Sequence, residues 1–287
     1  MIRQKSFEKD DAKIYIVGTP IGNLEDITIR AIETLKMVDI IYCEDTRNTS
    51  RLLSHYNITK KLKSYHLFNE NEITSELIER VKNGENVAIV SDAGMPCISD
   101  PGFLAVRDAA NNGIDVVVVP GVSAGLMAVV ASGITCSKYY YAGFLNSKPG
   151  KRLEELKKLS TKEETIIIYE APHRIKETLE LILQAMGDRY IVLARELTKK
   201  YEEYLRGTVS EILEVVDTLK GEMVIIISGQ KKEEQVKDLL SLTIKEHYNY
   251  YSNQMVDKKD AMKLVAKDRN ISKSVVYQEI FGKNKEQ

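Results

Sequence analysis

The sequence predicts an α/β protein made of two α/β domains and a small helical unit at its C-terminal end. Short β-branched runs alternate with helical patterns from residue 13 onward, and a second series of such runs begins near residue 139. From about residue 231 the strand-like runs stop. This alternation favours mostly parallel sheets with covered faces. We place the domains at 1–135 and 136–230, with a helical extension at 231–287.

In the first domain, β-branched runs and apolar residues at helical spacing predict the elements. Strands are predicted at 14–17, 40–42, 87–90 and 116–119. Helices are predicted at 26–38 and 124–131, with two more that end near 83–84 and 111–113, where Asn and Gly stop them.

The second domain and the extension follow by the same criteria. Strands are predicted at 139–142, 166–169, 191–194 and 224–227, with a helix at 173–186. In the extension, Lys258 to Lys267 has apolar residues at helical spacing, and Asn270-Ile271-Ser272 interrupts the pattern before a second helix. These two helices predict a small helix–turn–helix unit.

The bulk composition excludes several classes of protein. The formal net charge of the 287 residues is −1, so an RNA-binding role would need a local basic surface. The apolar runs are too short to span a bilayer, and residues 1–11 lack the apolar stretch of a signal peptide. Cys43, Cys97 and Cys136 have no metal-type or CxxC spacing. We expect reduced thiols, no metal site and a cytoplasmic protein.

Three loops that follow predicted strands carry the residues most suited to bind a ligand. They are residues 18–26, 91–102 and 120–124, each rich in Gly or Pro. In parallel sheets, ligands bind where the carboxyl ends of strands meet helix N-termini. Asp92 is suited to hold a ribose or an amino group, although Asp92 and Asp100 could equally cap turns. Ser123 is suited to cap a helix or to contact a ligand.

Three further strand ends pair carboxylates with arginines: residues 43–49, 169–174 and 194–200. One such cluster would usually be a surface ion pair. Three at equivalent positions indicate a polar cleft whose arginines suit RNA phosphates.

Seven strings in order then show a family resemblance: YIVGTPIGNLEDIT, EDTRNTSRLLSHY, SDAGMPCISDPG, PGVSA, YEAPHRI, ARELTK and GEMVIIISG. Over residues 13–230, and in the C-terminal unit, the chain resembles rRNA-modifying members of the tetrapyrrole methylase superfamily, the class III methyltransferases. The resemblance implies two α/β domains of this type with S-adenosylmethionine bound in the cleft between them, commonly in a homodimer. It also implies methylation of the ribose 2′-oxygen of a decoding-centre cytidine in 16S rRNA, within the 30S subunit.

Carried over motif by motif, the resemblance implies a set of site residues. The cofactor would contact Ile21, Asp92, Met95, Ser123, Ala124, Tyr169 and Met223. From the carboxylate–arginine clusters, rather than from the resemblance, we expect the RNA substrate to contact Asp45, Arg47, His173, Arg174 and Arg195.

Methyl transfer also needs a group that takes the hydroxyl proton. The candidates are Asp45, Glu170, His173, Glu196 and Lys199. We favour Glu170 and Glu196 because each directly follows a strand, with Lys199 as the alternative if its pKa is depressed. The same side chains could instead bind RNA or one another.

Two other functions stay open at this point. One is a methylase of the same superfamily acting on a tetrapyrrole-like small molecule or a modified peptide. The other is a non-catalytic RNA-binding protein of ribosome assembly.

Overall fold

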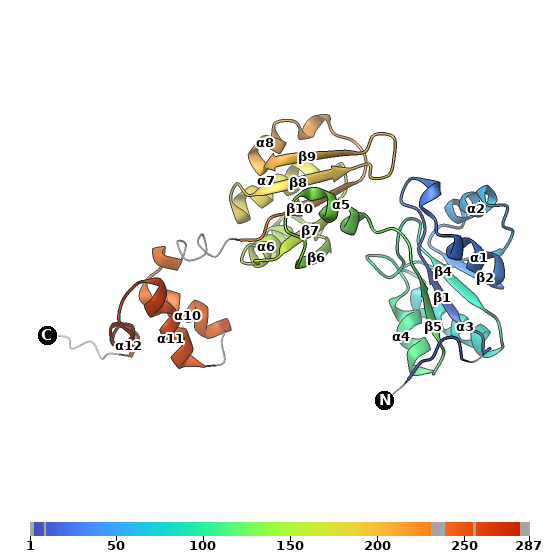
Figure 1. The fold of residues 1–287 in the computed structure, drawn as a ribbon, viewed down its shortest axis with the longest axis horizontal. Helices are drawn as coiled ribbons and strands as arrows, with labels where there is room; N and C mark the ends of the chain where they lie inside the picture. The colour runs from blue at the N-terminus through green and yellow to red at the C-terminus, as the bar shows by residue number, and fades with distance from the viewer. Residues whose placement is uncertain (1–2, 9, 231–238, 255–256, 282–287) are drawn as a thin grey trace. The chain divides into compact units, whose positions relative to one another are not determined.

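A computed structural model describes residues 3–8, 10–230, 239–254 and 257–281 (Figure 1). Contacts divide the chain into two compact units: Met1–Lys157 with Thr165–Ser228, and Lys158–Glu164 with Gly229–Gln287. No helix within the described ranges is long and apolar enough to cross a bilayer. The expected domain limits at 135 and 230 stay predictions, and residues 231–238 lie outside the described part.

The first sheet is wholly parallel, as the alternation of strands and helices predicts. Its strands are β1 (Ile14–Val17), β2 (Ile40–Cys43), β3 (Lys61–Ser64), β4 (Val87–Val90) and β5 (Val116–Val119). They lie in the order β3-β2-β4-β1-β5. The edge strand β3 was not predicted, because its polar sequence, Lys-Leu-Lys-Ser, lacks the apolar pattern of a buried strand. Its residues are exposed or only partly buried. All strand carboxyl ends therefore lie at one edge of the sheet, and the loops after β1, β4 and β5 gather there.

Two pairs of helices cover this sheet. One face is packed by α1 (Ile29–Met37) and α2 (Thr46–His55), the other by α3 (Glu70–Lys82) and α4 (Phe103–Asn111). The helix predicted at 26–38 starts later, because Thr28 caps it by accepting a hydrogen bond of 3.1 Å from the amide of Ala31.

The second sheet is mixed, which the strand pattern alone does not predict. Its strands are β6 (Tyr139–Phe144), β7 (Thr165–Glu170), β8 (Tyr190–Arg195), β9 (Glu203–Thr208) and β10 (Met223–Ile227). They are ordered β6-β7-β10-β8-β9, and β6 with β7 is the parallel pair. β10 is antiparallel to both neighbours, as β9 is to β8. The run 203–208, Glu-Tyr-Leu-Arg-Gly-Thr, carries no apolar signal because it forms an edge.

Four helices accompany the second sheet in the described chain. They are α5 (Ala124–Ser132), α6 (Pro149–Leu159), α7 (Ile175–Met186) and the short α8 (Val209–Leu213). Ala128 and Val129 of α5 share a core with Ile167 and Val224. By packing, α5 therefore belongs to the second sheet, although it precedes the boundary expected at 135.

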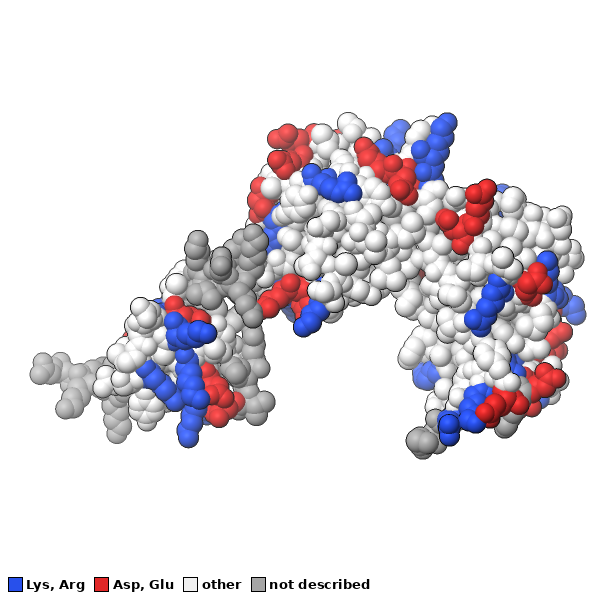
Figure 2. Space-filling view, viewed as in Figure 1, with Lys and Arg blue, Asp and Glu red and all other residues white. Residues whose placement is uncertain are grey.

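The C-terminal unit has its own small core. Its described helices are α10 (Ile244–Gln254), α11 (Lys258–Asp268) and α12 (Lys273–Phe281). Tyr248, Ala261, Val265 and Val276 are buried together in it. The two predicted helices correspond to α11 and α12, while α10 precedes them. The visible face of this unit carries basic side chains beside acidic ones (Figure 2).

Candidate functional site

The three loops expected to bind a ligand converge in the structure. Thr19 and Gly94 exchange two backbone hydrogen bonds, of 2.8 and 3.1 Å, which join the loop after β1 to the loop after β4. The loops after β1 and β5 approach even more closely: a Cβ on Gly18 would lie 2.6 Å from the Cα of Gly121. Only glycine permits this approach, so the backbone of all three loops forms one continuous surface.

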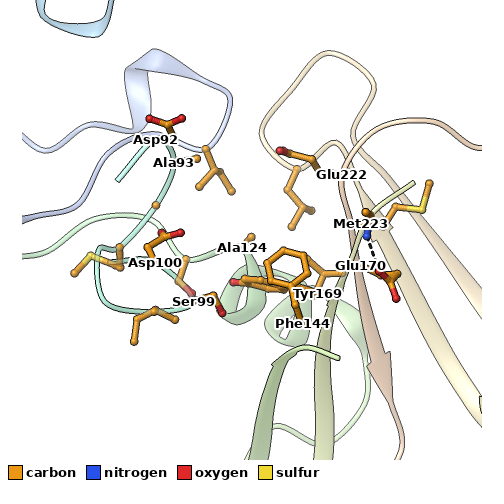
Figure 3. A pocket seen from close by; sticks show the side chains of 18 of the residues that line it. Asp92, Ala93, Ser99, Asp100, Ala124, Phe144, Tyr169, Glu170, Glu222 and Met223 are labelled. Carbon is orange, nitrogen blue, oxygen red and sulfur yellow. Dashed lines mark hydrogen bonds between the residues drawn. The ribbon is translucent and has the colours of Figure 1, made fainter. Parts of the chain in front are cut away.

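These loops line a cavity of about 450 Å³ together with residues of the second sheet (Figure 3). This volume lies within the range of small-molecule sites. All seven residues that the family resemblance assigns to the cofactor line it: Ile21, Asp92, Met95, Ser123, Ala124, Tyr169 and Met223. Ile98, Ser99, Asp100, Phe144, Leu197 and Glu222 line it too. Ile98, Ser99 and Asp100 lie in the loop after β4, which its position at the end of a strand indicated as a ligand site. No sequence signal marked these side chains individually as cavity residues.

Asp92 and Ser123 are two polar residues of the first-sheet loops that line the cavity. The Asp92 carboxylate accepts hydrogen bonds from the backbone amide of Asp45, at 3.1 Å, and from the side chain of Asn48, at 2.9 Å. Ser123 is the N-cap of α5 but makes no side-chain capping bond. A carboxylate beside a helix N-terminus can hold the hydroxyl, amino and carboxylate groups of a nucleoside or amino acid.

Tyr169 and Phe144 of the second sheet form the aromatic part of the wall. The hydroxyl of Tyr169 accepts a hydrogen bond of 2.9 Å from the amide of Gly125, near the start of α5. The rings of Tyr141 and Phe144 meet the Tyr169 ring edge-on, at centroid distances of 5.3 and 5.5 Å. These contacts hold a flat apolar surface in place, which suits an aromatic base.

Asp100 lies on the same wall as Asp92, opposite Glu222 and Met223 (Figure 3). Burial raises the pKa of its carboxyl to about 6, and the negative charges of Glu44 and Asp92 act in the same direction, against a hydrogen bond from Ser91. From the sequence, Asp100 could either cap a turn or contact a ligand. Its surroundings, which the fold assembles, distinguish it from an ordinary turn residue.

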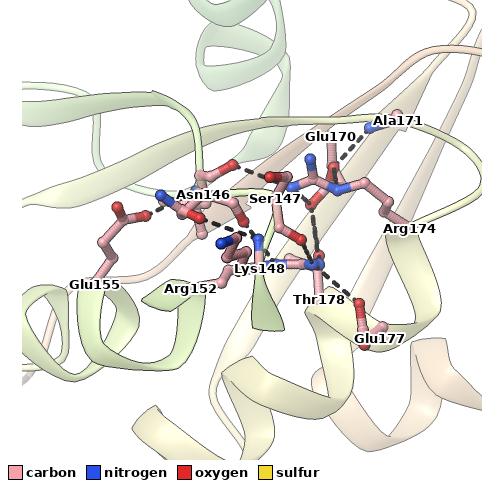
Figure 4. A network of polar contacts seen from close by, with 11 residues as sticks. Asn146, Ser147, Lys148, Arg152, Glu155, Glu170, Ala171, Arg174, Glu177 and Thr178 are labelled. Atoms are coloured by element: carbon pink, nitrogen blue, oxygen red, sulfur yellow. Dashed lines mark hydrogen bonds and ion pairs between the residues drawn. The ribbon is translucent and has the colours of Figure 1, made fainter. Parts of the chain in front are cut away.

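Glu170, one of the two favoured bases, is fully occupied by neighbouring groups (Figure 4). Its side chain is 0% exposed and lies 3.8 Å from the guanidinium of Arg152, which is also buried. It accepts hydrogen bonds from the hydroxyl of Thr178, at 2.5 Å, and from the amide of Ala171, at 2.8 Å. Arg174 pairs with it at 3.1 Å. These donors hold the carboxylate in place and leave it little freedom to reach a substrate proton, so the geometry favours a structural role.

The same network explains the position of Arg174, for which the carboxylate–arginine clusters predict an RNA contact. Besides Glu170, its guanidinium donates to the carbonyl of Leu145, at 3.1 Å. Arg152 donates to the carbonyls of Asn146 and Ser147. The two arginines therefore fasten the loop after β6 to the end of β7, and an RNA contact by Arg174 stays a prediction.

Lys199 lines the cavity, whereas Glu196 does not. The Lys199 amine lies 3.2 Å from both Glu196 and Glu222. Burial lowers the pKa of Lys199, but its hydrogen bonds and ion pairs with these carboxylates outweigh burial, and the net shift is upward. The depressed pKa that a lysine base requires is absent, and Glu196 is held as a partner of a cation.

The remaining substrate residues lie outside the cavity lining. Asp45 caps α2 and pairs with Arg47 at 2.6 Å, and hydrogen bonds from Arg47 lower the pKa of Asp45 to about 2. Arg47 is 84% exposed, and His173 is also exposed. Arg195 donates to Glu203 and to the carbonyl of Lys220. Arg47 and His173 are therefore the two expected substrate residues whose exposed side chains a large partner can contact.

Comparison with known proteins places this site in a family. Residues 13–213 match the model of the tetrapyrrole (corrin/porphyrin) methylases. The chain belongs to the tetrapyrrole methylase family. The curated relatives of this methylase include "Ribosomal RNA small subunit methyltransferase I" of Bacillus subtilis, 46% identical over 96% of this chain and 97% of the relative. The protein of the same name from Haemophilus influenzae is 40% identical, covering 95% of this chain and 93% of the relative.

Solved structures agree with the family fold. A diphthine synthase aligns with a TM-score of 0.59 at 14% identity, covering 76% of this methylase and 90% of that chain. Uroporphyrin-III C-methyltransferase from Thermus thermophilus, in complex with S-adenosyl homocysteine, aligns with a TM-score of 0.56 at 18% identity. It covers 76% of this methylase and 97% of that chain. At these identities the likeness concerns the fold.

Proposed function

We propose that this methylase transfers a methyl group from S-adenosylmethionine to the ribose 2′-oxygen of a decoding-centre cytidine in 16S rRNA, with the 30S subunit as its substrate. The observation that carries the proposal is the convergence of the three strand-end loops on a cavity lined by all seven expected cofactor residues. Relatives at 40–46% identity over nearly the full chain, which are named for small-subunit rRNA methylation, support an RNA substrate rather than a tetrapyrrole.

The cavity residues fit this cofactor by their chemistry. Asp92 and the start of α5 suit the polar ends of the molecule, while Ile21, Met95 and Tyr169 offer an apolar surface to the adenine. When bound, the cofactor supplies an activated methyl group on a sulfonium that is also the leaving group. The protein then has to align the hydroxyl, exclude water and take up its proton.

For the RNA, we propose contacts by exposed Arg47 and His173 and by the basic face of α11, which is formed by the exposed side chains of Lys259, Lys263 and Lys267. Phosphate contacts of this kind position an RNA without reading its sequence. A homodimer and a cytoplasmic location, where small subunits are found, belong to the same proposal.

The decisive experiment is methyl transfer from labelled S-adenosylmethionine to purified 30S subunits that lack the modification. Nuclease digestion and mass spectrometry of the nucleosides should find 2′-O-methylcytidine in 16S rRNA. Label in a base, in a protein or in added tetrapyrrole would assign a different substrate, and cofactor binding without any transfer would favour a non-catalytic role.

A further inference from the structure

Asp100 stands in a loop that is fastened on several sides. Buried Glu70, at the start of α3, accepts hydrogen bonds from the amides of Gly102, at 2.9 Å, and Leu104, at 3.3 Å. The amide of Cys97 donates to the carbonyl of Pro101 at 3.2 Å. The segment after Asp100 is thereby fastened to α3, and a backbone bond closes the loop around Asp100, so its side chain needs little reorganisation to act on a ligand.

A second anchor ties this loop to the wall of the cavity. The hydroxyl of Ser99 lies 2.7 Å from the hydroxyl of Tyr141, whose ring packs edge-on against Tyr169. The residue before Asp100 is thus connected to the aromatic surface proposed for the cofactor. Asp100 and this surface line the same cavity.

The other acid–base groups of the cavity are engaged elsewhere. Among the described lining residues, carboxylates and amines belong to Asp92, Asp100, Glu170, Lys199 and Glu222. Glu170 is buried in its arginine network, and Lys199 and Glu222 pair with each other at 3.2 Å. Asp92 accepts from the amide of Asp45 and from Asn48. Asp100 is the carboxylate lining this cavity that is partly buried and, among the described residues, forms no ion pair.

The charged and titratable groups around Asp100 also suit it to proton transfer. Glu44 at the end of β2 and Asp92 at the end of β4 repel its negative charge, and Cys97 and Tyr141 face it as neutral groups. Burial acts in the same direction as the two carboxylates, and the pKa of about 6 lies near the pH at which a base is both ionised and effective.

We propose that Asp100 is the general base that takes the proton from the substrate hydroxyl. This inference rests on the proposed function. As the hydroxyl oxygen bonds to the methyl carbon, the carbon–sulfur bond breaks and its electron pair remains on sulfur, which becomes a neutral thioether. The hydroxyl proton passes to the Asp100 carboxylate, which later releases it to water. The assignment replaces Glu170, Glu196 and Lys199 in this role.

The test compares Asp100→Asn, Asp100→Glu and wild type in single-turnover methylation of 30S subunits between pH 5 and 8, at saturating cofactor. Asp100→Asn should lower the rate at pH 8 by about 10²–10⁴-fold, the usual contribution of a positioned base. Asp100→Glu, which keeps a carboxylate, should recover part of it. The wild-type rate should rise with pH to a plateau, with a midpoint near pH 6. The residual rate of Asp100→Asn should not show this rise.

Binding of S-adenosylhomocysteine, measured by calorimetry, is the second readout. Its affinity should change less than about threefold in Asp100→Asn, because a base for the substrate contributes little to cofactor binding. Asp108→Asn on the outer part of α4, where Asp108 contacts Arg107, is the matched control and should match wild type in both assays.

The outcomes separate the two proposals. The role of Asp100 alone is overturned if the wild type methylates 30S subunits and Asp100→Asn does so at the same rate. It is also overturned if the wild-type methylation rate does not change between pH 5 and 8. Lost binding of S-adenosylhomocysteine by folded Asp100→Asn also overturns it, since Asp100 would then hold the cofactor. Wild-type protein that binds S-adenosylhomocysteine but methylates no 30S RNA overturns the proposed function and this inference with it.

Discussion

The hydroxyl of Thr178 donates a hydrogen bond of 2.5 Å to the buried carboxylate of Glu170, and the same hydroxyl accepts one of 2.6 Å from Arg152. Thr178 thus links two buried charges that lie on α6 and at the end of β7. Glu170 therefore compensates the charge of an arginine that is almost fully removed from water.

Glu170→Gln should consequently destabilise the fold. Removing one partner of a buried ion pair costs about 3–5 kcal/mol, because the other charge remains buried. Glu177→Gln is the matched control: Glu177 contacts Arg152 at 2.9 Å but is 49% exposed, so its loss should cost less than about 1 kcal/mol. Urea unfolding of the three proteins measures the difference. A stable Glu170→Gln protein that has lost methylation would return Glu170 to the role of base.

Asp92→Ala should weaken cofactor binding. A hydrogen bond to a charged group is worth about 1.5–3 kcal/mol, so the affinity for S-adenosylmethionine should fall at least about tenfold. Asn48→Ala removes a hydrogen-bond partner of Asp92 and leaves the carboxylate in place, which controls for local loosening at the start of α2. Calorimetry that finds equal losses in both variants would show that Asp92 acts through the loop rather than on the cofactor.

The basic face of α11 should contribute to binding of 30S subunits. Lys259, Lys263 and Lys267 recur every four residues and are exposed, whereas Ala261 and Val265 are buried. Changing the three lysines to glutamine should weaken binding and make its dependence on salt shallower, by about two to three units in the log–log slope. Affinity for S-adenosylhomocysteine should not change.

The matched control for this face is Lys82→Gln, an exposed lysine paired with Glu79 at the end of α3. Deletion of 240–287 should reproduce the triple variant. Residues 245–287 contain nine basic and six acidic side chains, of which Lys283, Lys285 and Glu286 lie outside the described residues. An unchanged salt slope in both the triple variant and the deletion would make the unit a structural cap.

The C-terminal unit should lose stability in mild acid through His247. The imidazole is 0% exposed, and its Nδ1 accepts a hydrogen bond of 3.1 Å from Arg269. Burial lowers the pKa of His247, and the charge of Arg269 adds to this, against the opposing effect of Asp268. A histidine with a depressed pKa contributes its full stability above the ordinary pKa of about 6.5 and loses it as the pH falls toward the folded-state value.

Hydrogen exchange of the helices α10, α11 and α12 should therefore become faster at pH 5.5 than the intrinsic pH dependence of exchange predicts. His247→Gln should remove this extra loss, whereas His55→Gln, at an exposed position, should keep it. Identical pH behaviour of the two variants would exclude His247 as the cause.

The sequence by itself determined where most strands lie and which loops form the site. The run 87–90 matches β4 residue for residue, because a strand buried in a parallel sheet must be apolar. The run 116–119 matches the edge strand β5, in which Val117 and Val119 are buried. Glycine, proline and aspartate after strands indicated the loops, and the family resemblance indicated seven residues, five of them in these loops, that the fold brings to one cavity.

Tertiary structure alone decided the roles of individual charges. Arg152 and Glu170 are far apart in sequence, and their pairing depends on how α6 packs beside β7. The raised pKa of Asp100 arises from burial and from Glu44, which lies on another strand end. The edge strands β3 and β9 could not be predicted either, because their polar and partly exposed sequences carry no apolar pattern. Local sequence thus specifies elements and loops, whereas the strength of a base depends on neighbours that only folding supplies.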